Sequence, residues 1–218
     1  MLTGHYGSGK SELAVNLAVR LARAGGDTVV MDLDIANPYF RSREMAGELR
    51  ERGVELIGNA YGYDITQDLP ALSPRIKSYL GNDRYKRVVD VGGDNSGARV
   101  LNQFSEALSE SEARMLMVVN VYRPETENAE KIIAMIHSIE AETGRKTAGM
   151  LNNSNMLRVT RPEHILNGLR ILMEVSEMTG IPVVANSAEK EVCENLPESS
   201  CPSLPMDLYL RPAWLDLN

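Results

Sequence analysis

Residues 4–11 read GHYGSGKS and match the pattern G-x-x-x-x-G-K-[S/T] in full. The glycines let the backbone curl, so that successive amide N–H groups point inward at phosphate oxygens. Lys10 adds a mobile ammonium for the β- and γ-phosphates, and the hydroxyl of Ser11 suits Mg²⁺, which prefers oxygen ligands. We therefore predict that residues 4–11 form a phosphate loop. The residues predicted to contact the nucleotide there are Gly4, Gly7, Ser8, Gly9, Lys10, Ser11 and Glu12.

The glycines of residues 4–11 could also belong to a dinucleotide-binding loop. That motif needs glycines at offsets 0, 2 and 5. Here the glycines lie at offsets 0, 3 and 5, and Lys-Ser follows them. An apolar stripe at helical spacing begins directly after the loop, at Leu13, while only residues 1–3 precede the loop for a strand. The spacing favours the phosphate loop.

Apolar runs alternate with helix-period segments along the chain. The apolar runs occupy residues 28–31, 87–91, 115–119, 147–151 and 181–184, and they suit strands buried on both faces. The helical stripes occupy residues 13–21, 132–139 and 165–173, each followed by glycine near residues 25, 144 and 180. We predict an α/β fold with a doubly wound, mostly parallel sheet flanked by helices, as in P-loop NTPases.

The composition bounds the class of protein. The 218 residues include 23 basic and 30 acidic ones, giving a net charge of −7, with 43% hydrophobic and 5% aromatic residues. These values predict one globular domain over residues 1–218, with an irregular, Pro-rich tail from about residue 197. Few aromatics and an acidic balance argue against direct nucleic-acid binding. No apolar stretch of about 18 residues and no secretory signal occur, so we expect a cytoplasmic protein.

Acidic residues follow two of the predicted strands. Asp32 and Asp34 are two residues apart, so both carboxylates can lie on one face at the carboxyl edge of the sheet. Asp90 ends another apolar run and is followed by Gly92-Gly93. An apolar run that ends in Asp is the usual partner of a phosphate loop and holds Mg²⁺ directly or through water. We predict a metal site from Ser11, Asp32 and Asp90.

Together these motifs resemble the deviant-Walker ATPases of the MinD/ParA/ArsA group. Residues 32–44, DLDIANPYFRSRE, look like those of a CobQ/CobB/MinD/ParA-like nucleotide-binding family. The resemblance implies that Asp34 is catalytic with Lys10 and orients the attacking water. It also implies that Asp32 lies in the outer sphere of Mg²⁺ and that Asp90 completes the metal site.

The group often dimerises with ATP between the subunits, so the resemblance implies an ATP-dependent homodimer. One departure lies in the loop, where the family's second lysine falls on His5. Histidine is mostly neutral at pH 7, which weakens the expectation of activation across such a dimer. His5 either donates one hydrogen bond to phosphate or is a solvated loop residue.

The base is predicted from residues 151–155, LNNSN, which follow a predicted strand. Guanine-specific relatives place a carboxylate here, and this chain has none. The amides of Asn152 and Asn153 can both donate to and accept from adenine, which favours ATP over GTP, although an Asn-rich turn needs no ligand. By resemblance, residues 182–186 supply backbone contacts to the adenine.

We therefore predict a Mg²⁺-dependent ATP-binding protein with slow ATPase activity, which acts as a nucleotide switch for an unknown protein partner. Two alternatives remain open: an ATP-dependent small-molecule ligase or kinase, and a GTPase-type metallochaperone. Arg41 and Arg43 are switch residues, contacts to a partner or acidic substrate, or a solvated helix start. Residues 206–218 are neither basic nor amphipathic, so no membrane-targeting helix is predicted.

Overall fold

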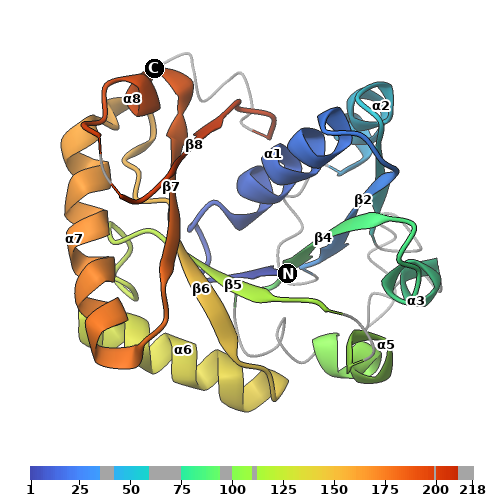
Figure 1. Cartoon of the computed structure of the whole chain (residues 1–218), viewed down its shortest axis with the longest axis horizontal. Coiled ribbons are helices and arrows are strands. Elements are labelled where there is room, and N and C mark those ends of the chain that lie inside the picture. The colour runs from blue at the N-terminus through green and yellow to red at the C-terminus, as the bar shows by residue number, and fades with distance from the viewer. Residues whose placement is uncertain (35–41, 59–74, 94–99, 110–111, 199, 211–218) are drawn as a thin grey trace, which may run out of the picture.

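The fold is a parallel sheet between two layers of helices, seen in a computed structural model (Figure 1). The structure describes the chain except residues 35–41, 59–74, 94–99, 110–111, 199 and 211–218. The strands are β1 (Leu2–Thr3), β2 (Thr28–Leu33), β3 (Val54–Ile57), β4 (Lys86–Val91), β5 (Met115–Val119), β6 (Thr147–Asn152), β7 (Val183–Glu189) and β8 (Ser203–Met206). The helices are α1 (Lys10–Arg23), α2 (Ser42–Glu51), α3 (Arg75–Leu80), α5 (Ser105–Ser109), α6 (Ala129–Thr143), α7 (Pro162–Thr179) and α8 (Lys190–Glu194). Two short 3-10 turns, η1 (Leu101–Phe104) and η2 (Leu157–Val159), complete the described elements.

The eight described strands lie in the order β3-β2-β4-β1-β5-β6-β7-β8, and all their pairings are parallel. The prediction of a doubly wound sheet is confirmed. The short strand β1 lies between β4 and β5, where successive connections leave in opposite directions. In an open α/β sheet, ligands bind outside the carboxyl ends of the strands at such a point. The phosphate loop begins there, directly after β1.

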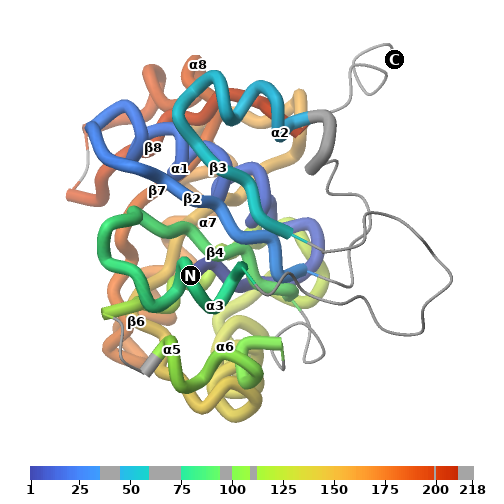
Figure 2. The backbone as a smooth tube through the Cα atoms, turned by 90° about the vertical axis from the view of Figure 1, so that its right-hand side faces the viewer, coloured from blue at the N-terminus to red at the C-terminus, as the bar shows by residue number. Residues whose placement is uncertain are grey.

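Alternating side chains of the buried strands supply both faces of the sheet. On one face, Val30 and Val88 pack with α1 and α2. On the other face, their neighbours Val29 and Val89 pack with α3 and the η1–α5 segment. Figure 2 shows α1 and α2 on one side of β2 and β4, with α3 and α5 on the other side. Since each strand residue alternates between these two cores, the apolar runs in the sequence are continuous.

Local sequence signals set the ends of the long helices. The side chain of Asn128 accepts a hydrogen bond of 2.9 Å from the backbone N–H of Lys131 and caps α6. Gly144 and Gly180 end α6 and α7 with φ angles of 64° and 75°. Among the described helices, none is both long and apolar enough to cross a bilayer.

The sequence predicted an irregular tail from about residue 197, but part of this tail is a regular strand. Residues 203–206 form β8, which pairs in parallel with β7 at the edge of the sheet. Pro205 lies within this strand, opposite Ala188. An edge strand tolerates proline because one of its sides needs no ladder hydrogen bond. The proline content therefore misled the prediction at this segment.

Candidate functional site

The phosphate loop connects the end of β1 to the start of α1. Gly4, Gly7 and Gly9 have φ angles of 143°, 75° and 82°, as expected for a loop whose amides turn inward. The N–H of Ser8 donates to the carbonyl of His5 at 3.0 Å, which closes the turn. No side chain caps α1 within the described part of the chain. The first N–H groups of this helix are therefore suited to an anion.

Two close backbone contacts show why glycine is needed around this loop. A Cβ atom on Gly4 would lie 2.1 Å from the carbonyl oxygen of Val118 in β5. A Cβ atom on Gly93, just after β4, would lie 2.0 Å from the carbonyl oxygen of Gly4. The ends of β4 and β5 thus support the loop at van der Waals contact.

The three acidic residues lie on the α1 side of the sheet. Val30 and Val88 pack against α1, and Asp32 and Asp90 follow them by two residues on the same strands. Asp32 and Asp90 are also directly opposite each other in the β2–β4 register. Asp34 follows one step beyond Asp32, and its N–H donates to Asp32 Oδ1 at 3.1 Å. The carboxyl groups therefore converge at the start of α1.

Electrostatics at this point favour an added cation. Lys10 Nζ lies 3.8 Å from Asp34 Oδ2, with the two side chains only 4% and 5% exposed. Burial raises the pKa of Asp90 to about 6, against the opposing effects of Lys10 and the nearby Ser11 hydroxyl. Burial, followed by the charge of Asp90, raises the pKa of Asp32 to about 8. Two of the three carboxyl groups beside Lys10 therefore ionise less readily than usual, and a further positive charge beside them would favour their ionised form.

Several buried polar atoms here have no hydrogen-bond partner among the described residues. They are both carboxyl oxygens of Asp90, Oδ1 of Asp34 and Oγ of Ser8. Buried polar groups are normally paired, so these atoms mark a place for a ligand. Mg²⁺ typically takes one or two carboxylates and completes its shell with phosphate oxygens and water. Asp90 and the neighbouring Ser11 suit that role, whereas Oδ1 of Asp32 already accepts the backbone of Asp34.

Asn152 and Asn153 form a structural link beside the loop. The amide of Asn152 donates to the carbonyl of Ile165 and to Oδ1 of Asn186, both at 2.8 Å, and its side chain is fully buried. The amide of Asn153 donates to the carbonyl of Ser8 at 2.7 Å. These bonds tie the phosphate loop to the ends of β6 and β7, a role that the sequence did not reveal. Recognition of the base by the two residues stays a prediction.

Residues 182–186 were predicted to follow the last strand, but most of them lie within it; their adenine contacts stay a prediction. Residues 183–189 form β7, and the backbone N–H of Asn186 donates to Pro202 across the β7–β8 pair. That backbone is used within the sheet because β7 extends five residues beyond the predicted strand end at residue 184. At the carboxyl edge, a cavity of about 720 Å³ lies instead between residues 157–162 after β6 and residues of the β7–α8 segment.

Glu12 holds the tail. Its carboxylate accepts hydrogen bonds from the N–H groups of Tyr209 and Leu210, at 2.5 and 3.1 Å. One turn further along α1, Asn16 exchanges two bonds of 2.9 Å with the backbone of Asp207. Residues 207–210, the tail segment, are thereby fixed to α1 directly after the phosphate loop. The predicted nucleotide contact of Glu12 stays a prediction, with its side chain engaged by the tail.

The turn after β5 brings a further charged residue to the loop. Arg123 Nε donates to the carbonyl of Gly7 at 3.0 Å, and Glu125 lies 3.5 Å from His5 Nδ1. Arg123 belongs to none of the sequence motifs; its position a few residues after an apolar strand is the signal that marks it. Arg41 lies outside the described residues, and so does the side chain of Arg43.

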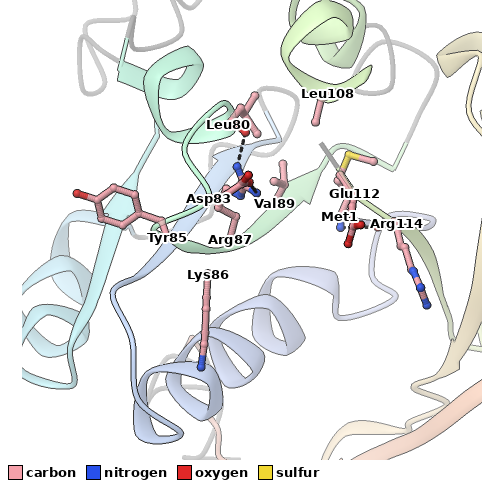
Figure 3. Close-up of a pocket in the computed structure, with 11 residues that line it drawn as sticks. Met1, Leu80, Asp83, Tyr85, Lys86, Arg87, Val89, Leu108, Glu112 and Arg114 are labelled. Carbon is pink, nitrogen blue, oxygen red and sulfur yellow. Dashed lines mark hydrogen bonds and ion pairs between the residues drawn. The ribbon is translucent and has the colours of Figure 1, made fainter. Parts of the chain in front are cut away.

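A cavity of about 640 Å³ lies at the opposite, amino edge of the sheet (Figure 3). The Arg87 guanidinium is bonded to the carbonyl of Leu80 and to Asp83. Lys86 points toward α1, where its ammonium donates to the carbonyl of Gly25. Because these charges are satisfied within the protein, the carboxyl edge remains the candidate site.

Comparison with known proteins identifies a nucleotide-binding family. A profile of the CobQ/CobB/MinD/ParA nucleotide binding domain matches residues 3–182. No curated protein sequence matches the chain.

Solved structures agree on the fold. The cell division protein FtsY from Thermotoga maritima superposes with a TM-score of 0.57 and 15% identity, over 87% of this chain and 61% of that one. A nucleotide-binding protein from Archaeoglobus fulgidus, in complex with ADP and with cobalt, gives 0.52 and 14%, over 91% and 80%. FtsY from Elizabethkingia anophelis in complex with GDP gives 0.54 and 15%, over 86% and 56%. The chain therefore spans less than two thirds of the length of the two FtsY structures.

Proposed function

This chain belongs to the CobQ/CobB/MinD/ParA nucleotide-binding family, and from that premise we propose that it binds ATP with Mg²⁺, hydrolyses it slowly and acts as a nucleotide switch. The observation that carries the proposal is the convergence of Lys10 with three acidic side chains at the start of α1, beside buried polar atoms that have no partner among the described residues. In a purely structural ion-pair network, buried polar atoms are normally paired.

Each residue has a role in this mechanism. Lys10 and the loop amides hold the triphosphate. Asp34 Oδ1, which has no partner among the described residues, orients water in line with the γ-phosphate, while Asp32 fixes the backbone of Asp34. Ser11 and Asp90 would hold Mg²⁺, which when bound neutralises charge on the phosphate oxygens.

The reaction is a hydrolysis. The oxygen of water bonds to the γ-phosphorus, and the bond from that phosphorus to the β–γ bridging oxygen breaks. ADP and inorganic phosphate leave, and one proton passes to solvent. Because little covalent work falls to the protein, positioning and charge stabilisation supply the catalysis.

ATP is the proposed nucleotide because residues 152–155 contain no carboxylate to accept guanine N–H groups. The base would occupy the cavity of about 720 Å³ at the carboxyl edge, next to this turn. Among proteins of similar fold, one is in complex with ADP and another with GDP, so the two bases need direct comparison.

The switch follows from the contact between Gly93 and Gly4. Because the backbones of Gly4 and Gly93 are in close contact, a change in the phosphate loop on loss of the γ-phosphate would move Gly93. A protein partner, or a second copy of the chain, would read that movement. A cytoplasmic location is part of this proposal.

The test is a parallel titration of ATP and GTP, with and without Mg²⁺, together with a time course of phosphate release. Lys10→Ala should abolish binding, and Asp34→Ala should preserve binding but stop turnover. Lys146→Ala is the matched control, because this lysine is 90% exposed and pairs only with Glu140 among the described residues. Unchanged ATP affinity in Lys10→Ala would refute the site, and a GTP preference would refute the choice of base. Binding without turnover until an acceptor is added would indicate a ligase or kinase.

A further inference from the structure

Arg123 lies against the phosphate loop although it comes from the turn after β5. Its Nε donates to the carbonyl of Gly7 at 3.0 Å. A Cβ atom placed on Gly7 would lie 3.0 Å from Nε, 3.2 Å from Cζ and 3.5 Å from Nη2 of this arginine. These three atoms of the guanidinium are therefore close to the middle of the loop.

The turn that carries Arg123 is fixed by buried hydrogen bonds. The N–H of Arg123 donates to the carbonyl of Asn120, and its carbonyl accepts from the N–H of Thr126. The Thr126 hydroxyl donates to the same Asn120 carbonyl at 2.7 Å, and both side chains are buried. The Asn120 side chain in turn accepts from the N–H groups of Tyr122 and Asn155. The arginine is thus held in place before any ligand binds.

The remaining donors of Arg123 are available. Within the described ranges, its Nη1 and Nη2 have no hydrogen-bond or ion-pair partner. The acidic residues nearest in sequence are engaged elsewhere, Glu125 beside His5 at 3.5 Å and Glu127 with Lys131 at 2.5 Å. A half-buried guanidinium with free terminal nitrogens next to a phosphate loop is suited to a phosphate oxygen.

The loop itself is short of positive charge. Position 5 is a histidine beside Glu125, and Lys10 faces Asp34. We propose that Arg123 supplies the second positive charge in cis, with its terminal nitrogens contacting the γ-phosphate of the bound nucleotide. This inference rests on the proposed function. As water bonds to the γ-phosphorus and the bridging bond breaks, Arg123 would stabilise the charge on the phosphoryl oxygens.

The experiment compares Arg123→Ala and Arg123→Lys with the wild-type protein. We expect Arg123→Ala to lower kcat for ATP by about 10³-fold, the lower range for an arginine at a transferred phosphoryl group. ADP affinity should stay within about twofold, because ADP lacks the contacted phosphate. Arg123→Lys should retain part of the rate, and guanidinium ion added to Arg123→Ala should restore part of it.

The matched control is Arg170→Ala, which removes an exposed arginine on α7 that bonds only to Asn167 among the described residues. The inference would be overturned by a loss of kcat in Arg123→Ala of less than about tenfold, or by an equal loss of ADP and ATP affinity. Arg123 would then have only a structural role, as a hydrogen-bond donor to the Gly7 carbonyl. Those results require an active wild-type protein. A wild-type protein that neither binds nor hydrolyses nucleotide would instead refute the proposed function, and the inference with it.

Discussion

Replacing the buried Asp90 with asparagine should stabilise the protein when metal and nucleotide are absent. Both carboxyl oxygens of Asp90 lack hydrogen-bond partners among the described residues, and the side chain has no exposure to solvent. The folded protein therefore holds an ionised carboxylate only at a cost. Asp90→Asn keeps the shape and removes the charge.

The size of the effect follows from the pKa. Burial raises the pKa of Asp90 from 3.8 to about 6, which corresponds to about 3 kcal/mol of folding free energy. For an acid with a raised pKa, the contribution to stability is present below the unfolded value and is lost as the pH rises through the folded value. Wild-type stability should thus fall between about pH 4 and about pH 7 through this group. Asp90→Asn has no carboxyl group at this position, so its stability does not fall with pH in this way.

The assay is urea denaturation in the presence of a chelator, at about pH 4.5 and about pH 8. The free energy of unfolding of Asp90→Asn, relative to wild type, should rise by about 2 kcal/mol between these conditions. Asp83→Asn is the control, because its side chain is 94% exposed and should show no such rise. Adding Mg²⁺ with ATP should make wild type more stable than Asp90→Asn, since only wild type gains stability from the bound ion. A constant difference between variant and wild type at both pH values would refute the reasoning.

Two substitutions test how the phosphate loop is supported, and a third tests how the tail segment is held. Gly93→Ala places a methyl group 2.0 Å from a loop carbonyl, so unfolding free energy should drop by about 1–3 kcal/mol and nucleotide affinity by about tenfold. Gly47→Ala, within α2 and with no atom within 4 Å, should cause neither loss; similar losses in both variants would contradict the steric argument. Asn153→Ala removes the bond of 2.7 Å to the loop and should cost about 1–3 kcal/mol in urea denaturation, so an unchanged midpoint would count against the link. Glu12→Ala should speed limited proteolysis within the tail segment, and equal cleavage rates would exclude its role as a clamp.

The sequence predicted the centre of the fold well because burial there is two-sided. The apolar runs at residues 87–91 and 115–119 correspond to β4 and β5 almost residue for residue. The stripe that contains Ile132, Ile136 and Ile139 lies wholly within α6, and all three side chains are buried. The edge strand β3 (Val54–Ile57) was missed, since its two central residues are only partly buried and give no apolar run. Helices such as α5 and α8, of five residues each, are too short to show a helical period.

In the candidate site, the roles that depend on local sequence were predicted, whereas those that depend on distant contacts were not. The loop glycines and the acids that end β2 and β4 were predicted, because each acts through its own strand or turn. Asp32 and Asp90 needed only the parallel register to meet. Hydrogen bonds to the region of the loop and the first turn of α1 come from much further away in sequence. Arg123 is separated from Gly7 by 116 residues, and Asn153 from Ser8 by 145.

These distant contacts decide what the phosphate loop can do beyond binding phosphate. A motif of eight residues predicts the curl of the backbone from local sequence alone. The charge near the γ-phosphate, by contrast, depends on which segment the sheet order brings alongside the loop. In this chain β5 lies next to β1, so the turn that follows β5 places Arg123 at Gly7, where the loop has His5 and no second lysine. The missing charge is therefore to be sought in the neighbouring strand connection, and not in the loop sequence.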